Sequence, residues 1–165
     1  MRLIQYRLII LFVSALFSCK NDKDKTTIFL VRHAEKDTTV DQYDPPLIKE
    51  GYERADKLRD ELTDKEIKYI FSTKFQRNKN TVGPLANHIS KKIHIYEYHK
   101  WQTMLDSVKT IPENHLICGH SDNLLPMIEY LGADVGKEKL GYLEYDNLFK
   151  VTIDEETVNG EIIKY

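Results

Sequence analysis

The sequence predicts an α/β fold, a three-layer α/β/α sandwich built on a mainly parallel sheet. Short apolar, β-branched runs alternate with amphipathic stretches from residue 26 to residue 131, which is typical of a parallel sheet covered by helices. Residues 148–153 and 158–163 instead alternate in polarity around Asp154-Glu155-Glu156-Thr157, which predicts an antiparallel hairpin. At 165 residues, 41% of them hydrophobic, the chain has room for one compact domain with a single active site.

The first 25 residues differ from the rest of the chain. Arg2 and Arg7 precede the apolar run Leu8–Phe17, and the polar stretch Lys20–Lys25 follows, which is the pattern of a secretory signal. As a helix this apolar run would span about 15 Å, roughly half of the hydrocarbon core of a bilayer. A signal that is removed after export therefore explains the run better than a permanent transmembrane helix.

The residues around Cys19 indicate a lipid anchor. Ser18, a small residue directly before Cys19, resembles the lipobox of bacterial lipoproteins, in which the cysteine is acylated and the preceding residues are removed. We therefore expect a signal peptide over 1–18, a lipidated Cys19 with a tether over 19–25, and the folded domain over 26–165. The protein would then be an exported, membrane-anchored lipoprotein on the periplasmic or cell-surface side. An uncleaved anchor, or a secretory signal with an incidental cysteine, is the alternative, and either would still export the domain.

The domain is expected to begin with a strand, a loop and a helix. Thr26–Val31 is an apolar, β-branched run that predicts a buried strand ending at Arg32-His33. Ala34–Pro46 is polar and holds two prolines, which indicates a loop. From Leu47 to Leu62 apolar residues recur every three or four positions, which predicts an amphipathic helix with Pro45-Pro46 at its start.

The alternation of strands and helices continues through the middle of the chain. The expected strands lie at 67–71, 93–96 and 116–118, and the expected helices at 78–89, 101–108 and 123–131. Two of these strands end on polar residues, at Ser72-Thr73 and at Gly119-His120. Because ligands of such sheets bind outside the carboxyl ends of the strands, these exits, with Arg32-His33 and Arg77, are candidates for one site.

The charge pattern argues against nucleic acid as a partner. The chain has 24 Lys and Arg against 26 Asp and Glu, for a net charge of -2, and the two signs are mixed along the sequence. Nucleic-acid binders concentrate Lys and Arg on one face instead. The sequence also has no HExxH motif and no paired-cysteine spacing, so we expect no metal site. Cys118 lies in an apolar strand, where packing is its expected role.

Four motifs in their order along the chain resemble the histidine phosphatase superfamily, which includes the phosphoglycerate mutases. They are Leu30-Val31-Arg32-His33-Ala34-Glu35-Lys36, the helix Leu47–Ala55, the block Phe71–Thr81, and Leu116-Ile117-Cys118-Gly119-His120-Ser121. The sequence departs from the family pattern at Ala34, where a glycine is usual, and at Ile48, where a hydroxyl residue would cap the helix. The resemblance covers nearly all of the chain from Thr26 onward.

This resemblance implies a phosphatase that works without a metal ion or cofactor. His33 would attack phosphorus through one neutral ring nitrogen to give a phosphohistidine intermediate, which water then hydrolyses. Its other ring nitrogen would donate to a backbone carbonyl and so fix the tautomer. Arg32 and Arg77 would bind the phosphoryl oxygens with their planar guanidinium groups, and His120 would add a third donor.

The leaving oxygen needs a proton, and two glutamates could supply it. The family's donor follows the third strand, which favours Glu97; Glu35, two residues after His33, is the alternative donor or else pairs with an arginine. The expected substrate is a phosphorylated small molecule or a phosphoprotein, including one that carries phosphohistidine. Mutase-type phosphoryl transfer is less favoured, because only short loops, 37–46 and 97–110, could retain a product. A non-catalytic, phosphate-binding surface lipoprotein is the rival from another class.

Overall fold

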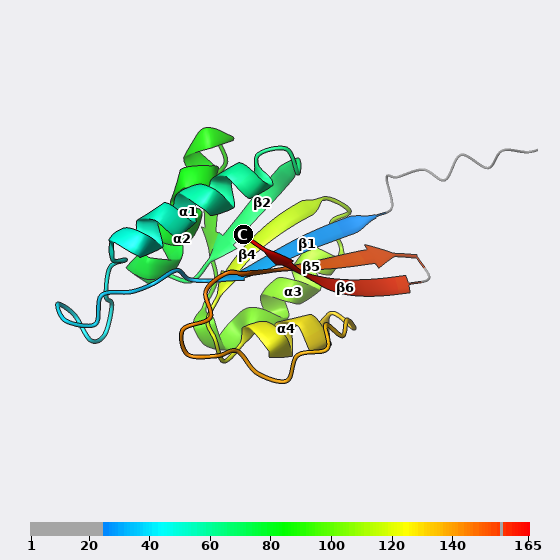
Figure 1. Ribbon diagram of the computed structural model, residues 1–165. Coiled ribbons are helices and arrows are strands. Elements are labelled where there is room, and N and C mark those ends of the chain that lie inside the picture. Colours follow the sequence, from blue (N-terminus) through cyan, green and yellow to red (C-terminus); the bar gives the residue numbers. More distant parts are fainter. Residues whose placement is uncertain (1–24, 156) are drawn as a thin grey trace, which may run out of the picture.

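The computed structural model of the protein describes residues 25–155 and 157–165 (Figure 1). The predicted signal peptide, Cys19 and the tether up to residue 24 lie outside the described residues. Among the helices that are described, none combines the length and the apolar character needed to cross a membrane.

A six-stranded sheet forms the middle of the domain, with the strand order β3-β2-β4-β1-β5-β6. The strands are β1 (Thr26–Arg32), β2 (Ile67–Ser72), β3 (Ile93–Ile95), β4 (Asn114–Gly119), β5 (Asn147–Asp154) and β6 (Thr157–Lys164). The first four strands run parallel to one another, whereas β5 is antiparallel to both β1 and β6. The predicted mainly parallel sheet with a C-terminal antiparallel hairpin is therefore confirmed.

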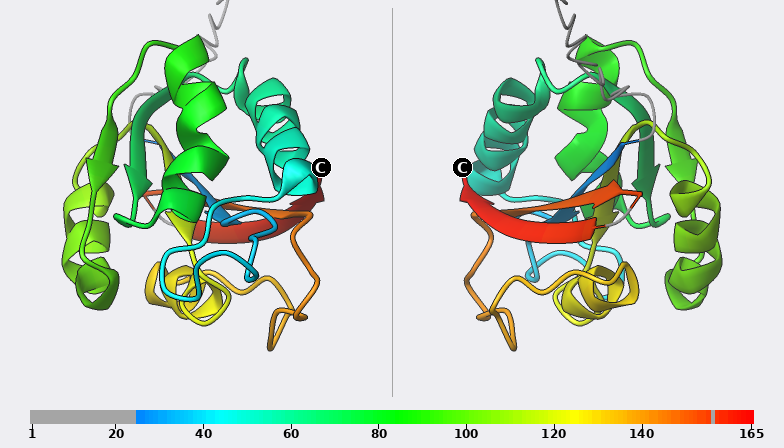
Figure 2. Two further views of the ribbon diagram at one scale, coloured as in Figure 1. Left: turned by 90° about the vertical axis from the view of Figure 1, so that its left-hand side faces the viewer. Right: turned by 90° about the vertical axis from the view of Figure 1, so that its right-hand side faces the viewer.

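Helices cover both faces of this sheet (Figure 2). The α-helices are α1 (Lys49–Leu62), α2 (Gln76–His88), α3 (Trp101–Lys109) and α4 (Leu124–Tyr130), and a short 3-10 helix, η2 (Tyr98–Lys100), precedes α3. In β1, Phe29 and Val31 face the core formed with α1 and α2, while Ile28 and Leu30 face the core formed with α3 and α4. The alternation along one strand thus fills two cores, and the three-layer sandwich is confirmed.

Long-range contacts move two helix starts away from their predicted positions. Leu47 pairs with Lys36 in a β-bridge, and this extended pairing delays the start of α1 to Lys49. In α2 the reverse happens, because the Asp44 carboxylate accepts a hydrogen bond from the Gln76 backbone N–H at 2.8 Å. That contact caps the helix from outside and lets it begin two residues before the predicted Asn78.

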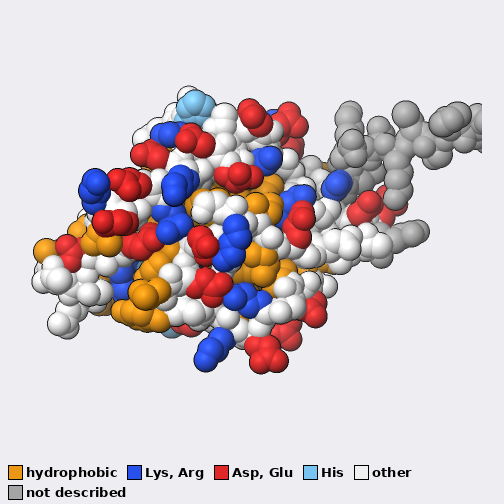
Figure 3. All heavy atoms as spheres, in the orientation of Figure 1, with side chains coloured by type: hydrophobic (Ala, Val, Ile, Leu, Met, Phe, Trp, Pro, Cys, Tyr) orange, Lys and Arg blue, Asp and Glu red, His pale blue; other side chains and the backbone are white. Residues whose placement is uncertain are grey.

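The surface mixes charges of both signs. Figure 3 shows acidic and basic side chains interspersed over one face of the domain, as the nearly equal counts of 24 and 26 suggest. The C-terminus lies beside α1, where the Arg54 guanidinium is 5.9 Å from the centre of the Tyr165 ring (Figure 1). The end of β6 is therefore packed onto the body of the domain.

Candidate active site

The carboxyl ends of three parallel strands bring the predicted residues together. β2, β4 and β1 are neighbours, and their registers place Ser72 opposite Cys118 and Arg32 opposite Gly119. The backbone N–H of His33 donates to the Gly119 carbonyl at 3.2 Å, which continues the pairing past the end of β1. As a result, the ring centres of His33 and His120 lie 5.5 Å apart.

His33 is buried and its ring orientation is fixed by its own backbone neighbour. Its Nδ1 lies 2.9 Å from the Ala34 carbonyl oxygen, which can only accept a hydrogen bond. Nδ1 therefore carries the proton, and Nε2 keeps its lone pair. Burial lowers the pKa of His33 to about 3, and the positive charges of Arg77 and Arg32 act in the same direction. The ring is thus neutral at physiological pH, with one nitrogen available for attack.

His120 is held from both its backbone and its ring. Its N–H donates to the Asn123 Oδ1 at 2.8 Å, and its Nε2 lies 3.1 Å from the Thr73 Oγ1. A Cβ at Gly119 would lie 2.8 Å from that Asn123 oxygen, so a larger residue here would displace the side chain that holds the His120 N–H. Burial, followed by the charge of Arg77, lowers the pKa of His120 to about 4.

Arg77 presents unfilled hydrogen-bond donors at the site. Its Nε and NH1 atoms are buried and have no hydrogen-bond partner in residues 25–155 and 157–165. The Asp44 carboxylate lies 3.8 Å from NH1, too far for a hydrogen bond, and the Phe75 ring centre lies 4.3 Å from the guanidinium carbon. Buried donors without partners are costly, so this guanidinium is arranged to receive an anion.

Arg32 is arranged differently from Arg77. Its NH1 donates to the carbonyls of Gly141, Tyr142 and Glu144 at 3.0 to 3.3 Å, and its guanidinium stacks 4.2 Å from the centre of the Tyr145 ring. Its buried Nε has no partner within the described part of the chain. The sequence predicted the same phosphate-binding role for both arginines. In the structure the NH1 of Arg32 is bonded to the segment before β5, and only its Nε is left for a ligand.

The two candidate acids have separate surroundings. Glu35 forms an ion pair with Arg54, whose Nε and NH2 donate three hydrogen bonds of 2.6 to 2.9 Å to both carboxylate oxygens. Glu97 is exposed and lines a groove of about 450 Å³ beside the site, together with Thr73 and Phe75. The carboxylate of Glu35 is therefore occupied, and that of Glu97 faces solvent.

A network on α2 supports the loop that follows His33. Thr81 accepts the backbone N–H of Ala34 at 2.9 Å and donates to the Arg77 carbonyl at 2.7 Å. Asn78 donates to the Gly119 carbonyl at 2.9 Å, the same oxygen that receives the His33 N–H. One turn of α2 thus ties the ends of β1 and β4 together.

Sequence reasoning missed two members of the site. Lys36 lies close enough that burial and the charges of Arg77 and Arg32 lower the pKa of its ammonium group. Asn123 holds the backbone N–H of His120, as described above. Asn123 had a local signal, because Asn side chains can hydrogen-bond to backbone groups three residues earlier in the chain. Lys36 carried none beyond its place in the opening motif.

Other polar residues have structural roles. Ser72 is buried and donates to the Thr73 carbonyl at 2.9 Å, while Ser121 is exposed. Burial raises the pKa of the Cys118 thiol to about 12, which agrees with the expected packing role. Within the described residues no group of three His, Cys, Asp or Glu side chains could hold a metal ion.

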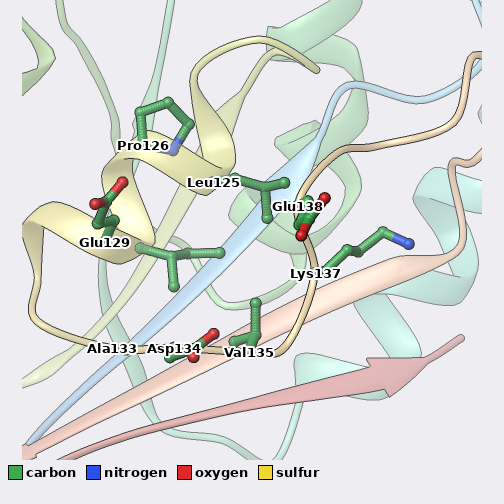
Figure 4. A pocket seen from close by; sticks show the side chains of 9 residues that line it. Leu125, Pro126, Glu129, Ala133, Asp134, Val135, Lys137 and Glu138 are labelled. Atoms are coloured by element: carbon green, nitrogen blue, oxygen red, sulfur yellow. The ribbon is translucent and has the colours of Figure 1, made fainter.

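A second cavity, of about 580 Å³, lies between α4 and the segment 133–138 (Figure 4). Its lining combines the apolar Leu125 and Val135 with the charged Glu129 and Lys137. None of the predicted site residues that the structure describes contributes to this lining. The chemistry therefore belongs to the site at the strand ends.

Comparisons with known proteins agree with this geometry. Residues 28–104 match the family model described as "Histidine phosphatase superfamily (branch 1)", and no curated protein matches the chain. Similar solved structures include the protein histidine phosphatase SixA in complex with tungstate, at 18% identity, with 83% of this chain and 94% of that chain covered and a TM-score of 0.59.

Two further structures have the same fold. Phosphoglycerate mutase from Bacillus anthracis str. Sterne is 15% identical, with 86% of this chain and 94% of that chain covered and a TM-score of 0.66. A mycobacterial glucosyl-3-phosphoglycerate phosphatase is 10% identical, with coverages of 86% and 98% and a TM-score of 0.56. At these identities the likeness shows a shared fold, and substrates do not transfer with it.

Proposed function

Because this chain belongs to the histidine phosphatase superfamily (branch 1), whose enzymes are typically phosphoric monoester hydrolases, we propose that it hydrolyses phosphate monoesters through a phosphohistidine on His33. One observation carries the proposal. The neutral His33 has a free Nε2, and the nearby Arg77 has buried donors that an anion would fill. Attack on a dianionic phosphate requires a nucleophile beside a cation whose N–H donors can bind the phosphate oxygens.

The first half of the reaction transfers the phosphoryl group to the enzyme. Arg77 and the Nε of Arg32 donate to the phosphoryl oxygens, and His120, which follows β4, adds a third donor. The His33 Nε2 forms a bond to phosphorus while the ester P–O bond breaks. Glu97 gives its proton to the leaving oxygen, so that an alcohol departs.

The second half returns the enzyme to its starting state. Glu97, now a carboxylate, accepts a proton from a water molecule as the water oxygen attacks phosphorus. The P–N bond breaks, phosphate leaves, and the lone pair returns to the His33 Nε2. Side chains supply all of the positive charge in both steps, so the proposed reaction needs no metal ion.

Three other functions share parts of this site. Hydrolysis of a protein phosphohistidine would use the same nucleophile and cations with a nitrogen leaving group. Mutase-type transfer would need the first product to be retained. The loop 37–46 is short, and the second predicted loop, 97–110, consists mainly of η2 and α3, so neither segment favours retention. A non-catalytic phosphate-binding protein would use the cations without the free His33 Nε2.

Phosphate release from a panel of phosphorylated metabolites and phosphopeptides tests the proposal. Arg77→Ala should lower turnover of every accepted substrate by roughly 10²–10³, the usual effect of removing one transition-state donor. Arg59→Ala is the matched control, because Arg59 lies on α1 and pairs with Asp56 and Asp60 away from the site. A chelator should leave the activity unchanged.

The other outcomes of this experiment separate the rival functions. Phosphate binding without release from any substrate favours the non-catalytic binder, and transfer to a second hydroxyl favours the mutase. Wild-type turnover in Arg77→Ala would remove that residue from the site.

We further propose that the domain is exported and held at a membrane by a lipid on Cys19. The support comes from the sequence alone, in the apolar run Leu8–Phe17 followed by Ser18-Cys19. The substrate would then be one that occurs on the periplasmic or cell-surface side.

A further inference from the structure

The groove beside His120 is walled largely by aromatic rings. Its volume is about 450 Å³, and Tyr43, Phe75, Tyr98 and His99 all contribute to its lining. A volume of this size is sufficient for a ring with a short substituent. The walls therefore offer flat, apolar surfaces to whatever group is attached to the phosphate.

This groove is continuous with the phosphate site. Thr73 lines the groove and also lies 3.1 Å from the His120 Nε2. The Phe75 and Tyr98 rings stand almost perpendicular to the His120 ring, with centres 5.6 Å and 5.1 Å from it. A phosphoryl group bound at His120 would thus place its leaving group directly against these rings.

The rings are held in place before any ligand binds. Tyr98 donates through its hydroxyl to Asp122, and the Tyr43 ring packs edge-on against Phe75 with centres 5.8 Å apart. Asp44, the next residue after Tyr43, caps α2 at Gln76 and so ties the 37–46 loop to this wall. Tyr43 itself is 74% exposed, so its ring remains accessible to a ligand in the groove.

We propose that the groove selects phosphate monoesters whose leaving group carries an aromatic ring. This proposal rests on the proposed function and names its substrate class. The phosphoryl group binds at Arg77 and His120, and the ring of the leaving group packs between Tyr43, Phe75 and Tyr98. Aromatic pairs gain energy beyond the area that they bury, so a flat ring binds better here than a saturated ring of equal size.

Two phosphonates, which have a C–P bond that the enzyme cannot hydrolyse, measure this preference. Phenylphosphonate and cyclohexylphosphonate carry the same anion on rings of similar size, one flat and one puckered. Calorimetry on the full chain in detergent should show tighter binding of phenylphosphonate, by roughly 2- to 12-fold for each ring contact. Equal binding of the two probes would overturn the proposal.

A variant and a matched control place the preference in the groove. Tyr43→Leu should reduce the preference for phenylphosphonate by roughly 2- to 12-fold. Tyr52→Leu removes a half-exposed ring on α1 that does not line the groove, and it should leave the preference unchanged. A preference that Tyr43→Leu leaves unchanged would contradict the proposal.

The two proposals can fail separately in these experiments. Phosphate release without a ring preference overturns the groove and leaves the proposed function standing. A ring preference in binding, without release from any ester, overturns the proposed function alone. Comparing free phenyl phosphate with a phosphotyrosyl peptide then shows whether the aryl ester comes from a small molecule or from a protein.

Discussion

A histidine can attack phosphorus only through a ring nitrogen that carries no proton. In His33 the Ala34 carbonyl holds the proton on Nδ1, and burial keeps a second proton off Nε2. The cations around the ring act in the same direction, since each repels an added positive charge. The arginines that would bind phosphate thus also keep the Nε2 of His33 unprotonated.

This environment predicts how His33 and His120 titrate. Without phosphate, both rings should remain neutral from pH 8 to pH 5, because their pKa values are lowered to about 3 and about 4. In the chain unfolded by urea both should titrate near the ordinary value of about 6.5. NMR of the ring carbons distinguishes the two states. Protonation of His33 near pH 6.5 in the folded protein would contradict this account of the site.

The same shifts make the stability depend on pH. Between pH 6.5 and their lowered pKa values, the unfolded chain binds protons that the folded chain excludes. The free energy of unfolding should therefore fall as the pH drops through this window, by about 1.4 kcal/mol per pH unit for each ring. Above pH 6.5 these two residues should contribute no slope.

The proton donor is tested by comparing two conservative substitutions. Glu97→Gln should slow esters with poor leaving groups far more than esters with good ones, because only the former need the proton. Glu35→Gln should lack this dependence and should instead lower the stability, since it weakens the ion pair with Arg54. If Glu35→Gln shows the leaving-group dependence and Glu97→Gln does not, Glu35 is the donor.

The site was predictable where a residue follows a strand and carries its chemistry in its own side chain. His33, Arg77 and His120 meet that condition, and the structure brings them together. The sequence could not predict which arginine is bonded to backbone carbonyls, because the partners of Arg32 lie in the segment 141–144, more than one hundred residues away. The support that Thr73 gives to His120 likewise depends on strand order.

At the scale of elements, α1 sets the position of the loop after His33. Its first turn approaches the loop so closely that a Cβ at Gly51 would lie 2.4 Å from the Glu35 carbonyl oxygen. The same oxygen accepts the Ile48 N–H at 3.0 Å, just before the helix begins. The helix thus packs against backbone two residues from His33, and this explains the glycine in the motif.

Adding a methyl group at Gly51 should therefore disturb both folding and activity. We expect Gly51→Ala to destabilise the protein by about 1–3 kcal/mol and to lower kcat/KM, because the Glu35 backbone must shift. Gly83→Ala on α2 is the control, since no atom described outside its chain neighbours lies within 4 Å of the new Cβ. There the gain in helix propensity opposes the clash with Pro84, so a change below about 1 kcal/mol is expected.

Denaturant unfolding and steady-state kinetics on the two variants check this prediction. Equal changes in the free energy of unfolding and in kcat/KM for Gly51→Ala and Gly83→Ala would show that the close approach of α1 to the Glu35 backbone affects neither stability nor activity.

Element boundaries were less predictable than the elements themselves. Apolar periodicity located every strand and helix of the sheet layers, because it reflects burial of one face. The start of α2 depends on Asp44, which lies 32 residues before its partner Gln76. No local pattern contains that contact, and the same holds for the bridge from Lys36 to Leu47 that delays α1.

At the scale of the whole molecule, strand order creates the site. β4 lies between β2 and β1, so elements distant in sequence end at one edge of the sheet. Hydrophobic periodicity predicts the number and type of elements but contains no information about their order. The position of β4 between β2 and β1 therefore comes from the structure alone.

The proposed lipid anchor concerns the whole chain, and a substitution of Cys19 tests it. Because acylation requires the thiol, Cys19→Ser should abolish lipid labelling and leave either precursor or a soluble exported form. Cys118→Ser is the control, since the Cys118 side chain is buried in β4 and should leave labelling unchanged. Unchanged labelling and membrane fractionation in Cys19→Ser would contradict the anchor.

The central claim is that His33 carries the phosphoryl group during turnover, and trapping that group tests it most directly. Quenching the reaction in alkali should leave phosphate on the peptide that contains His33, in a form stable to base and lost in acid, as expected for a phosphoramidate. His33→Ala should trap no phosphate and should not turn over, while Arg77 still allows a phosphate analogue to bind. Full activity in His33→Ala, or a trapped phosphate on another residue, would contradict the claim.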